Sequence, residues 1–278
     1  MSTPAVEVID SFLGELRTVS TTGGGTALST TRALVFIPRG THWFSVTPRN
    51  LVTGAEVAQV GFCPWGTVLV AVSGGDAADA LRDDSVNAQD GDAATDITLS
   101  LLATLADGGR IYVGSSRRFR GIYCDVDAAN GTAATILVEY WANNRWVDAS
   151  ATDGTASGGA TFAIDGAITW TVPAAWGAGK LNAMLNLNPR DTRDHAQRNM
   201  YWMRISVSAA MDAATTLNSL VLLQRSANLT ELIDGQTFTM RQPDVDGHEG
   251  TSAVEVFVDA GTGNLVVNAA ARKEFLSD

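Results

Sequence analysis

Short apolar runs separated by glycine and proline form the main pattern in the first part of the chain. One run covers residues 32–38, a second and more aromatic run covers 42–47, and two more cover 56–62 and 67–72. Strands that recur about every ten residues between Gly and Pro are typical of an antiparallel sandwich or barrel. The run 67–72 is apolar throughout, so we expect that strand to be buried on both faces.

The middle of the chain has the clearest strand pattern. Residues 200–208 alternate between apolar and polar side chains, which is the period of a half-buried strand. Two hairpins are predicted, one over residues 134–148 around Asn143-Asn144 and one over residues 161–172 around Asp165-Gly166, because such pairs suit two-residue turns. The stretch that follows, 178–199, is expected to be irregular.

Composition changes over residues 74–96, where seven aspartates accompany a single cation, Arg82. Acidic residues with Ala and Gly between them are typical of a linker or a surface loop. We therefore predict a mainly β protein built from antiparallel β-sandwich or jelly-roll-like modules with a C-terminal arm. The predicted parts are an N-terminal β-rich domain over 1–73, an acidic linker or loop over 74–96, a β-sandwich domain over 97–225 and a C-terminal arm or extension over 226–278.

The C-terminal segment is more polar than the rest. Residues 252–259 and 264–267 are expected to pair as an edge hairpin, and residues 268–275 to form a short terminal helix. Since nothing in this segment requires a core of its own, we expect it to pack on a neighbouring subunit.

Charge excludes two classes of partner. The 278 residues include 19 Lys and Arg against 30 Asp and Glu, a formal net charge of −11. Nucleic acid and anionic membranes both require positive surface, so neither is a predicted partner. No apolar run approaches the ~18 residues of a membrane-spanning helix, and residues 1–10 lack the layout of a signal peptide. The chain is expected to stay in the cytoplasm in which it is made.

Motifs for catalysis or metal binding are missing from the sequence. Cys63 and Cys124 have no metal-ligand spacing and are expected to be buried free thiols. No Gly-x-Ser-x-Gly, Walker or His-Glu-x-x-His motif occurs, and residues 90–92 lack the closing Glu of a calcium loop. A glycosidase needs only two carboxylates from anywhere in the chain, and Glu139 is the glutamate in a well-defined central strand. We predict no enzyme, no cofactor and no metal.

Three tryptophans are candidate interaction residues. Trp141, Trp146 and Trp170 lie in or beside the predicted hairpins. Aromatic rings on a sheet fill the sandwich core, form a subunit interface or stack on sugar rings. All three roles remain open from the sequence.

An arginine cluster is the second candidate. Arg117, Arg118 and Arg120 surround Phe119 in an otherwise acidic chain. Because guanidinium groups pair bidentately with carboxylates, this cluster suits contact with a neighbouring subunit. These three arginines and the three tryptophans are the predicted interface residues.

Motifs along the middle of the chain occur in the order 110–114, 118–123, 136–141, 145–148, 152–155, 168–173, 201–205 and 213–218. This series resembles the β-sandwich module found in structural proteins of tailed bacteriophages, and it covers residues 110–220, under half of the chain. The resemblance implies a virion protein present in many copies, with no catalytic residues to carry over. Such modules occur in tail, neck, baseplate, fibre and capsid-decoration components, so the resemblance does not select one role.

We therefore interpret the chain as a bacteriophage virion structural protein that is made in the host cytoplasm, forms a homo-oligomer and contacts other virion proteins. A β surface that is near neutral outside the acidic stretch suits a subunit covered by its neighbours. The alternative is a carbohydrate-binding adhesin or receptor-binding module with a host-surface glycan as partner. That alternative requires at least two of Trp141, Trp146 and Trp170 to be exposed on one face. A polysaccharide hydrolase using Glu139 stands third.

Overall fold

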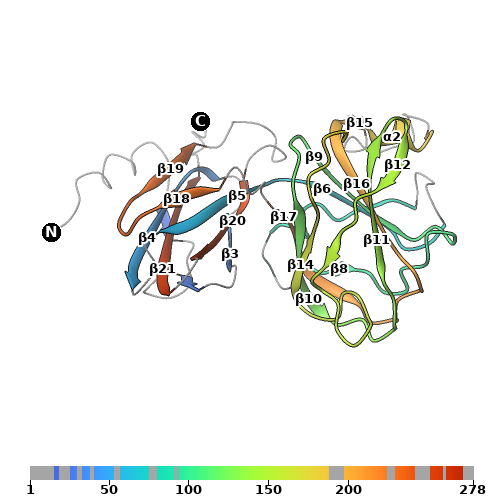
Figure 1. Cartoon of the computed structure of the whole chain (residues 1–278), viewed down its shortest axis with the longest axis horizontal. Coiled ribbons are helices and arrows are strands. Elements are labelled where there is room, and N and C mark those ends of the chain that lie inside the picture. Colours follow the sequence, from blue (N-terminus) through green and yellow to red (C-terminus); the bar gives the residue numbers. More distant parts are fainter. Residues whose placement is uncertain are drawn as a thin grey trace, which may run out of the picture. The chain divides into compact units, whose positions relative to one another are not determined.

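The computed structural model describes residues 16–18, 26–29, 33–37, 41–52, 57–74, 80–90, 92, 94–187, 197–223, 229–241, 251–258 and 261–271. The chain divides into two compact units, and each contains two antiparallel sheets (Figure 1). Unit 1 comprises residues 1–63 and 226–278, and unit 2 comprises residues 64–225. The predicted fold class, mainly β with antiparallel sandwich-type sheets, is confirmed.

Unit 1 combines strands from both ends of the chain. Its strands are β1 (Leu16–Thr18), β2 (Thr26–Leu28), β3 (Ala33–Phe36), β4 (Thr41–Val52), β5 (Ala58–Pro64), β18 (Thr230–Leu232), β19 (Phe238–Arg241), β20 (Thr251–Val258) and β21 (Thr262–Ala271). One sheet has the order β1-β21-β4-β19, with β2 also paired to β21, and the other has the order β18-β5-β20-β3. Phe44, Val46, Val256 and Val267 belong to the apolar core of this unit.

The C-terminal segment does not form the predicted arm. β20 lies between β5 and β3, and β21 lies between β1 and β4. The two strands belong to different sheets, so the predicted edge hairpin between them does not form. Residues 268–271 are part of β21, where a short helix was predicted. Residues 272–275 lie outside the described residues. The reason is burial, because Val254, Val256, Leu265 and Val267 supply apolar side chains that complete the core begun by the N-terminal strands.

Unit 2 also contains two sheets. Its elements are β6 (Thr67–Ala71), β7 (Arg82–Asp83), β8 (Ile97–Thr98), β9 (Arg110–Ser115), β10 (Gly121–Ala128), β11 (Ile136–Ala142), β12 (Arg145–Asp148), β13 (Thr152–Asp153), β14 (Gly166–Thr169), β15 (Ala178–Lys180), α2 (Leu181–Met184), β16 (Asn199–Val207) and β17 (Thr216–Leu223). The first sheet has the order β13-β14-β10-β17-β8, and the second has the order β12-β11-β16-β9-β6-β7, with β15 on β16. Ile122 and Leu222 from the first sheet and Val113 and Ile205 from the second share one apolar core.

The boundary between the units differs from the predicted one. β6, which the sequence pattern places in the N-terminal domain, pairs with β9 and β7 inside unit 2. In sequence, unit 2 is inserted between β5 and β18, which are antiparallel neighbours with Ala58 opposite Leu232 and Val60 opposite Thr230. Composition predicts the domain boundary at residues 74–96. The units instead divide between residues 63 and 64, because β6 pairs with β9 of unit 2.

Part of the acidic stretch is built into unit 2. Gln89 is fully buried, and its side-chain amide accepts a hydrogen bond from Gly66 N at 2.8 Å and donates one to Gly66 O at 2.7 Å. Asp84 forms an ion pair with Arg82 at 2.8 Å. Residues 75–79, 91 and 93 lie outside the described residues. Asp84 and Gln89 are therefore integrated into unit 2, whereas Asp92 and Ala94 are exposed as a surface loop predicts.

The first predicted hairpin is confirmed and the second is not. In the β11–β12 hairpin, Trp141 lies opposite Trp146, and Asn143 and Asn144 have φ of 51° and 58°, as a two-residue turn with two left-handed residues requires. Residues 161–165 instead form turns, and β14 pairs with β10 and β13. In this pairing Ile168 of β14 lies opposite Ile122 of β10, and both side chains belong to the apolar core.

Two smaller expectations are also tested by the described residues. All of β6 is buried, as its uninterrupted apolar run predicted. No helix in the described part of the chain is long and apolar enough to cross a membrane, and α2 has four residues.

Candidate interaction surface

Several loops of unit 2 meet at one end of its sheets. β9 ends at Ser115 and β10 begins at Gly121, so residues 116–120 form a turn at this end. Ser115 pairs with Tyr201 near the start of β16, and Lys180 pairs with Asn199 at that start. Because β11 is antiparallel to β16, the turn between β11 and β12 reaches the same end, near α2 and β15 at the top of Figure 1.

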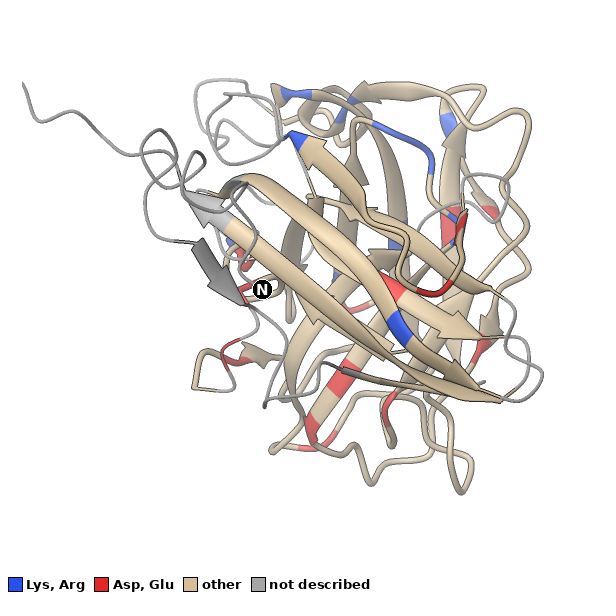
Figure 2. Cartoon of the chain, turned by 90° about the vertical axis from the view of Figure 1, so that its left-hand side faces the viewer, with Lys and Arg blue, Asp and Glu red and all other residues tan. Residues whose placement is uncertain are grey.

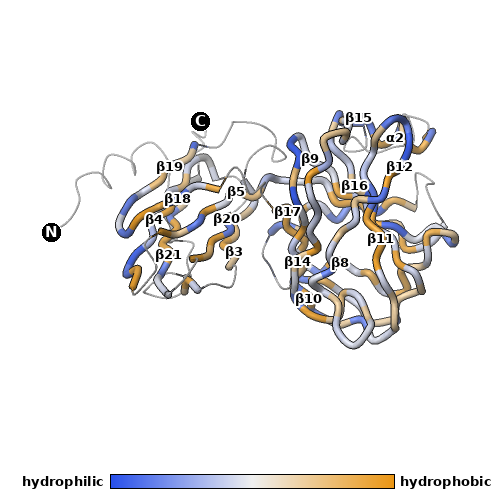
Figure 3. Tube along the Cα trace, viewed as in Figure 1, coloured by the Kyte–Doolittle hydropathy of each residue, from blue (hydrophilic) through white to orange (hydrophobic). Residues whose placement is uncertain are grey.

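We call this end the arginine end and define it by five of the cations that lie there, Arg117, Arg118, Arg145, Lys180 and Arg198. No ion pair joins any of the five to an acidic residue in the described part of the chain. Figure 3 shows hydrophilic segments in the loops beside α2 and β12. This end of unit 2 therefore presents positive charge that the described chain leaves uncompensated.

The predicted arginine cluster is split by the fold. Arg117 is exposed, whereas Arg118 and Arg120 are half-buried. Arg118 donates from Nη2 to Trp176 O at 2.7 Å, its guanidinium carbon lies 5.1 Å from the ring centroid of Tyr201, and its Nε is buried without a hydrogen-bond partner. These contacts fix the guanidinium of Arg118 in place at the arginine end.

The three predicted tryptophans separate into two environments. Trp170 is 6% exposed, donates from Nε1 to Phe119 O at 3.1 Å and packs edge-on against the Phe119 ring, so it is a core residue. Trp141 and Trp146 are half-buried, and their rings meet edge to face with centroids 5.2 Å apart. Trp141 O accepts a hydrogen bond from Gly177 N, which follows the Trp176 that Arg118 contacts. The tryptophan pair therefore adjoins the arginine end.

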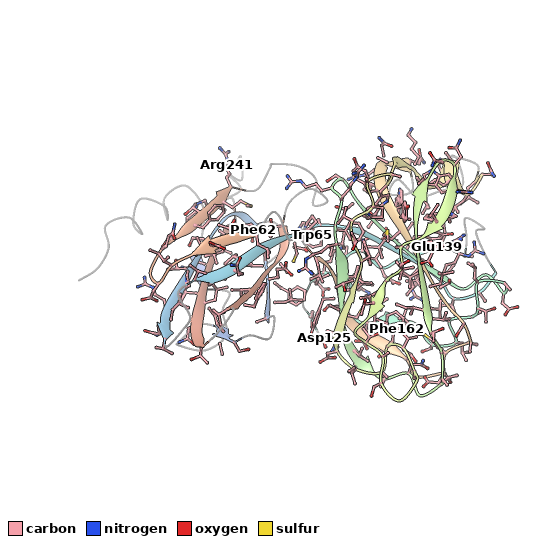
Figure 4. All side chains as sticks on the ribbon, in the orientation of Figure 1. Phe62, Trp65, Asp125, Glu139, Phe162 and Arg241 are labelled. Atoms are coloured by element: carbon pink, nitrogen blue, oxygen red, sulfur yellow. The ribbon has the colours of Figure 1, made fainter. Side chains whose placement is uncertain are left out.

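An ion pair lies beside the tryptophan pair. Arg204 donates from Nε at 2.8 Å and from Nη2 at 2.6 Å to Oε2 of Glu139, and its guanidinium carbon lies 4.9 Å from the Trp146 ring centroid. Figure 4 labels Glu139 on β11. This geometry gives Glu139 a structural partner, because Arg204 holds the carboxylate against the sheet.

A second apolar layer, not predicted from the sequence, covers this outer face of the sheet. Leu69, Tyr112, Leu181 and Trp202 form a buried cluster there, with Trp146 packed against it. The uninterrupted apolar run of β6 was the available signal, since a strand buried on both faces requires a cover on each side.

Aspartates gather at the opposite end of unit 2, where β10 ends and β17 begins. Asp127 Oδ2 accepts a hydrogen bond from the Thr216 hydroxyl at 3.0 Å, and Asp165 Oδ1 accepts one from Val126 N at 2.8 Å. Asp212 Oδ2 accepts one from Gly131 N at 2.6 Å, and this bond is the main reason that the pKa of Asp212 is lowered. We call this the aspartate end and define it by Asp107, Asp125, Asp127, Asp165 and Asp212.

The two ends separate the charge of unit 2 along its strands. Figure 2 draws the charged residues of both units together, with Lys and Arg blue and Asp and Glu red. Tyr123, on β10, has its pKa raised by burial first and then by the charges of Asp165 and Asp125. The field of the aspartates therefore acts on neighbouring groups.

Two exposed apolar side chains accompany the aspartates. Leu101 is 60% exposed and has φ of 58°, and its N–H donates to Asp212 O at 2.9 Å. Ile164, directly before Asp165, is 48% exposed. A leucine in the left-handed region is uncommon, because its Cβ lies close to the backbone in that conformation.

The cysteines and acidic groups show no redox or metal geometry in the described chain. Cys63 and Cys124 are buried and free, as predicted, and burial raises the pKa of the Cys124 thiol far above its ordinary value. No group of three His, Cys, Asp or Glu that could hold a metal ion occurs among the described residues. Asp90 and Asp92 instead accept local hydrogen bonds, from Asp92 N at 2.9 Å and Ala94 N at 3.0 Å.

In chemical terms, the arginine end and the adjoining tryptophan pair can bind carboxylates and flat apolar surfaces. Comparison with known proteins finds no matching family model, no similar curated protein and no similar solved structure.

Proposed function

We propose that this chain is a non-catalytic structural subunit that acts through protein–protein contacts, as a homo-oligomer within the virion of a tailed bacteriophage. The assembly role is argued from the surface of unit 2. The phage assignment rests on the motifs of residues 110–220 and on the resemblance they carry.

One observation carries the proposal, namely that uncompensated arginines and half-buried tryptophans occur together at one end of unit 2. Interfaces between proteins are enriched in Arg and aromatic residues and depleted in Lys. The chain follows the same bias, with 17 arginines and two lysines. A surface of this composition favours contact with another protein over turnover of a small molecule.

Sedimentation velocity and native mass spectrometry of the purified full chain, over a wide concentration range, test the assembly role. We expect a discrete homo-oligomer at micromolar concentration. A chain that stays monomeric throughout this range contradicts the proposal. Separately, particles purified from a producing lysate are expected to contain the chain in many copies, and its absence from them would remove the phage assignment.

A second candidate function, carbohydrate binding, is favoured by the tryptophan pair. Trp170 is buried, so the pair Trp141 and Trp146 is the part of the predicted platform that reaches solvent. Sugar rings stack on such aromatic faces through their C–H groups, and the nearby Glu139 and Arg204 carry polar groups that sugar hydroxyls bind.

Glycan-array binding by the intact chain and by Trp141→Ala checks this second candidate. If the pair binds sugar, Trp141→Ala loses a signal that Trp43→Ala retains, since Trp43 is a half-buried tryptophan of unit 1. No glycan signal above background for the intact chain rules the candidate out.

A further inference from the structure

We infer that copies of this chain associate head to tail, with the arginine end of unit 2 in one copy docking on the aspartate end of unit 2 in the next. The inference rests on the proposed assembly function and specifies the contact that the assembly uses.

The first argument for this contact is that the two ends of unit 2 have opposite charge. Arg117, Arg145 and Lys180 are exposed at one end, and Asp127 and Asp165 are exposed at the other. None of these cations has an ion-pair partner in the described chain. The partner that matches each end is therefore present on every other copy, and opposite potentials steer such surfaces together.

The second argument is that both ends also expose apolar side chains. The arginine end adjoins the half-buried pair Trp141 and Trp146. The aspartate end holds Leu101, 60% exposed, and Ile164, 48% exposed. Charged groups alone give specificity, whereas apolar side chains that lose water on contact give affinity. Both ends thus have the composition of an interface.

Backbone strain at Leu101 is the third observation. Its φ of 58° lies in the left-handed region, which favours glycine, yet the position carries a large side chain that points to solvent. Strained residues occur where surrounding structure holds a side chain for a function. The hydrogen bond from Leu101 N to Asp212 O at 2.9 Å ties this side chain to the aspartate end.

Like charges disfavour an isologous contact made by either end alone. An isologous contact joins the same patch on both subunits, so it would place five cations of the arginine end opposite five others. Joining unlike ends avoids this repulsion and makes the contact heterologous. A heterologous contact generates a ring when the rotation closes and a filament when it does not.

A charge-swap experiment with the full chain tests this contact. Variant one is Arg117→Glu/Arg145→Glu, and variant two is Asp127→Lys/Asp165→Lys, and all four side chains are exposed. Each variant alone is expected to associate about tenfold or more weakly than the wild type, because the net charge of its altered end falls from five to one. An equimolar mixture is expected to recover association between unlike variants, because the unaltered aspartate end of variant one meets the unaltered arginine end of variant two.

The control is Arg49→Glu/Arg241→Glu, which makes the same change in net charge as variant one at two exposed sites of unit 1. This control is expected to assemble like the wild type. Added salt weakens the wild-type contact as well, since charges are screened beyond about 10 Å at 0.1 M salt. Circular dichroism checks that each variant is folded. If the lysines of variant two unfold the chain, Leu101→Ser tests the aspartate end with less perturbation.

Three results overturn the inference: a folded variant one that assembles like the wild type, folded variants whose mixture stays dissociated, or a control that dissociates as readily as variant one. A wild type that is oligomeric in any of these cases leaves the proposed assembly function standing. A wild type that is monomeric at every concentration removes both. Capture of a polyanion such as dextran sulfate by the arginine end of a monomeric chain would assign that end to a different partner.

Discussion

Leu101 shows how a single residue departs from what local preferences favour. A leucine in the left-handed region costs about 1–2 kcal/mol because its Cβ crowds the backbone. Leu101 has φ of 58° and is 60% exposed, so burial of its side chain within the described structure offsets little of this cost. Use of the Leu101 side chain in a contact between copies would account for this conformational cost.

We predict that Leu101→Gly stabilises the fold and weakens association. Removing the Cβ relieves the strain, while the added freedom of glycine in the unfolded chain offsets part of the gain, which leaves about 0.5–1 kcal/mol. Chemical denaturation measures the stability and sedimentation velocity the association. Leu137→Gly is the control, since Leu137 is also exposed but lies in the regular strand β11, and there a loss of stability is expected. A destabilised Leu101→Gly contradicts the strain argument.

Asp212 is the residue with the clearest pH dependence. Hydrogen bonds from Gly131 N, from Ala214 N and from the Thr215 hydroxyl lower its pKa. A lowered folded pKa means that the fold prefers the charged carboxylate. The resulting stability is present above the unfolded pKa of about 3.9 and is lost as the pH falls through the folded pKa.

Asp212→Asn is therefore expected to be less stable than the wild type at pH 7, and the difference is expected to shrink as the pH is lowered below about 4. Urea unfolding midpoints of both proteins, measured from pH 7 down to pH 2.5, give the comparison. A difference that stays constant over this range would show that the charge of Asp212 contributes nothing.

At the scale of elements, the β11–β12 hairpin is specified by its own turn. Asn143 and Asn144 both have left-handed φ, and asparagine adopts this conformation more readily than most residues. The turn sets the register that places Trp141 opposite Trp146. Local chemistry therefore positions the tryptophan pair.

We expect Asn143→Ala/Asn144→Ala to destabilise the protein by about 1–2 kcal/mol, because alanine tolerates the left-handed region poorly. Asn144→Gly is the matched variant and is expected to retain or slightly raise the stability, since Asn-Gly is the preferred pair for this turn. Thermal unfolding measures both, and near-UV circular dichroism reports on the tryptophan pair. Equal effects of the two variants would show that the turn does not set the hairpin.

Other elements needed partners far away in the sequence. The apolar residues of β20 and β21 predicted strands, but the two strands enter different sheets beside β3, β4 and β5. The second predicted hairpin failed for the same reason, because β14 pairs with β10 as well as with β13. A turn signal acts over a few residues, whereas the choice of sheet depends on which pairing buries the apolar face.

For the whole molecule, the main feature is that unit 2 is inserted between two paired strands of unit 1. Each unit has its own apolar core, one around Phe44 and Val256 and one around Val113 and Ile205. A compact unit with its own core can fold alone. β5 and β18 are paired neighbours that need a connecting segment, and unit 2 is that segment here. A short linker would meet the same need.

Residues 64–225 expressed alone are expected to fold with the near-UV signal of a packed sandwich. Calorimetry of the fragment is expected to show one cooperative transition that matches one of two transitions in the full chain. A companion variant, in which a short Gly/Ser linker joins residue 63 directly to residue 226, is expected to retain the other transition. A fragment of 64–225 that is unfolded under native conditions contradicts independent folding.

The sequence by itself determined the β class, the hairpin at Asn143-Asn144, the double burial of β6 and the buried free cysteines, because each depends on periodicity, turn chemistry or composition within a few residues. Only the tertiary structure decided that the C-terminal strands complete the N-terminal sandwich, that Trp170 is buried while Trp141 and Trp146 reach solvent, and that cations and aspartates occupy opposite ends of unit 2. Strand pairing made those choices, because it selects the arrangement that buries the most apolar surface across distant segments. The same pairing brings the loops that carry the cations to one end of unit 2 and those that carry the aspartates to the other.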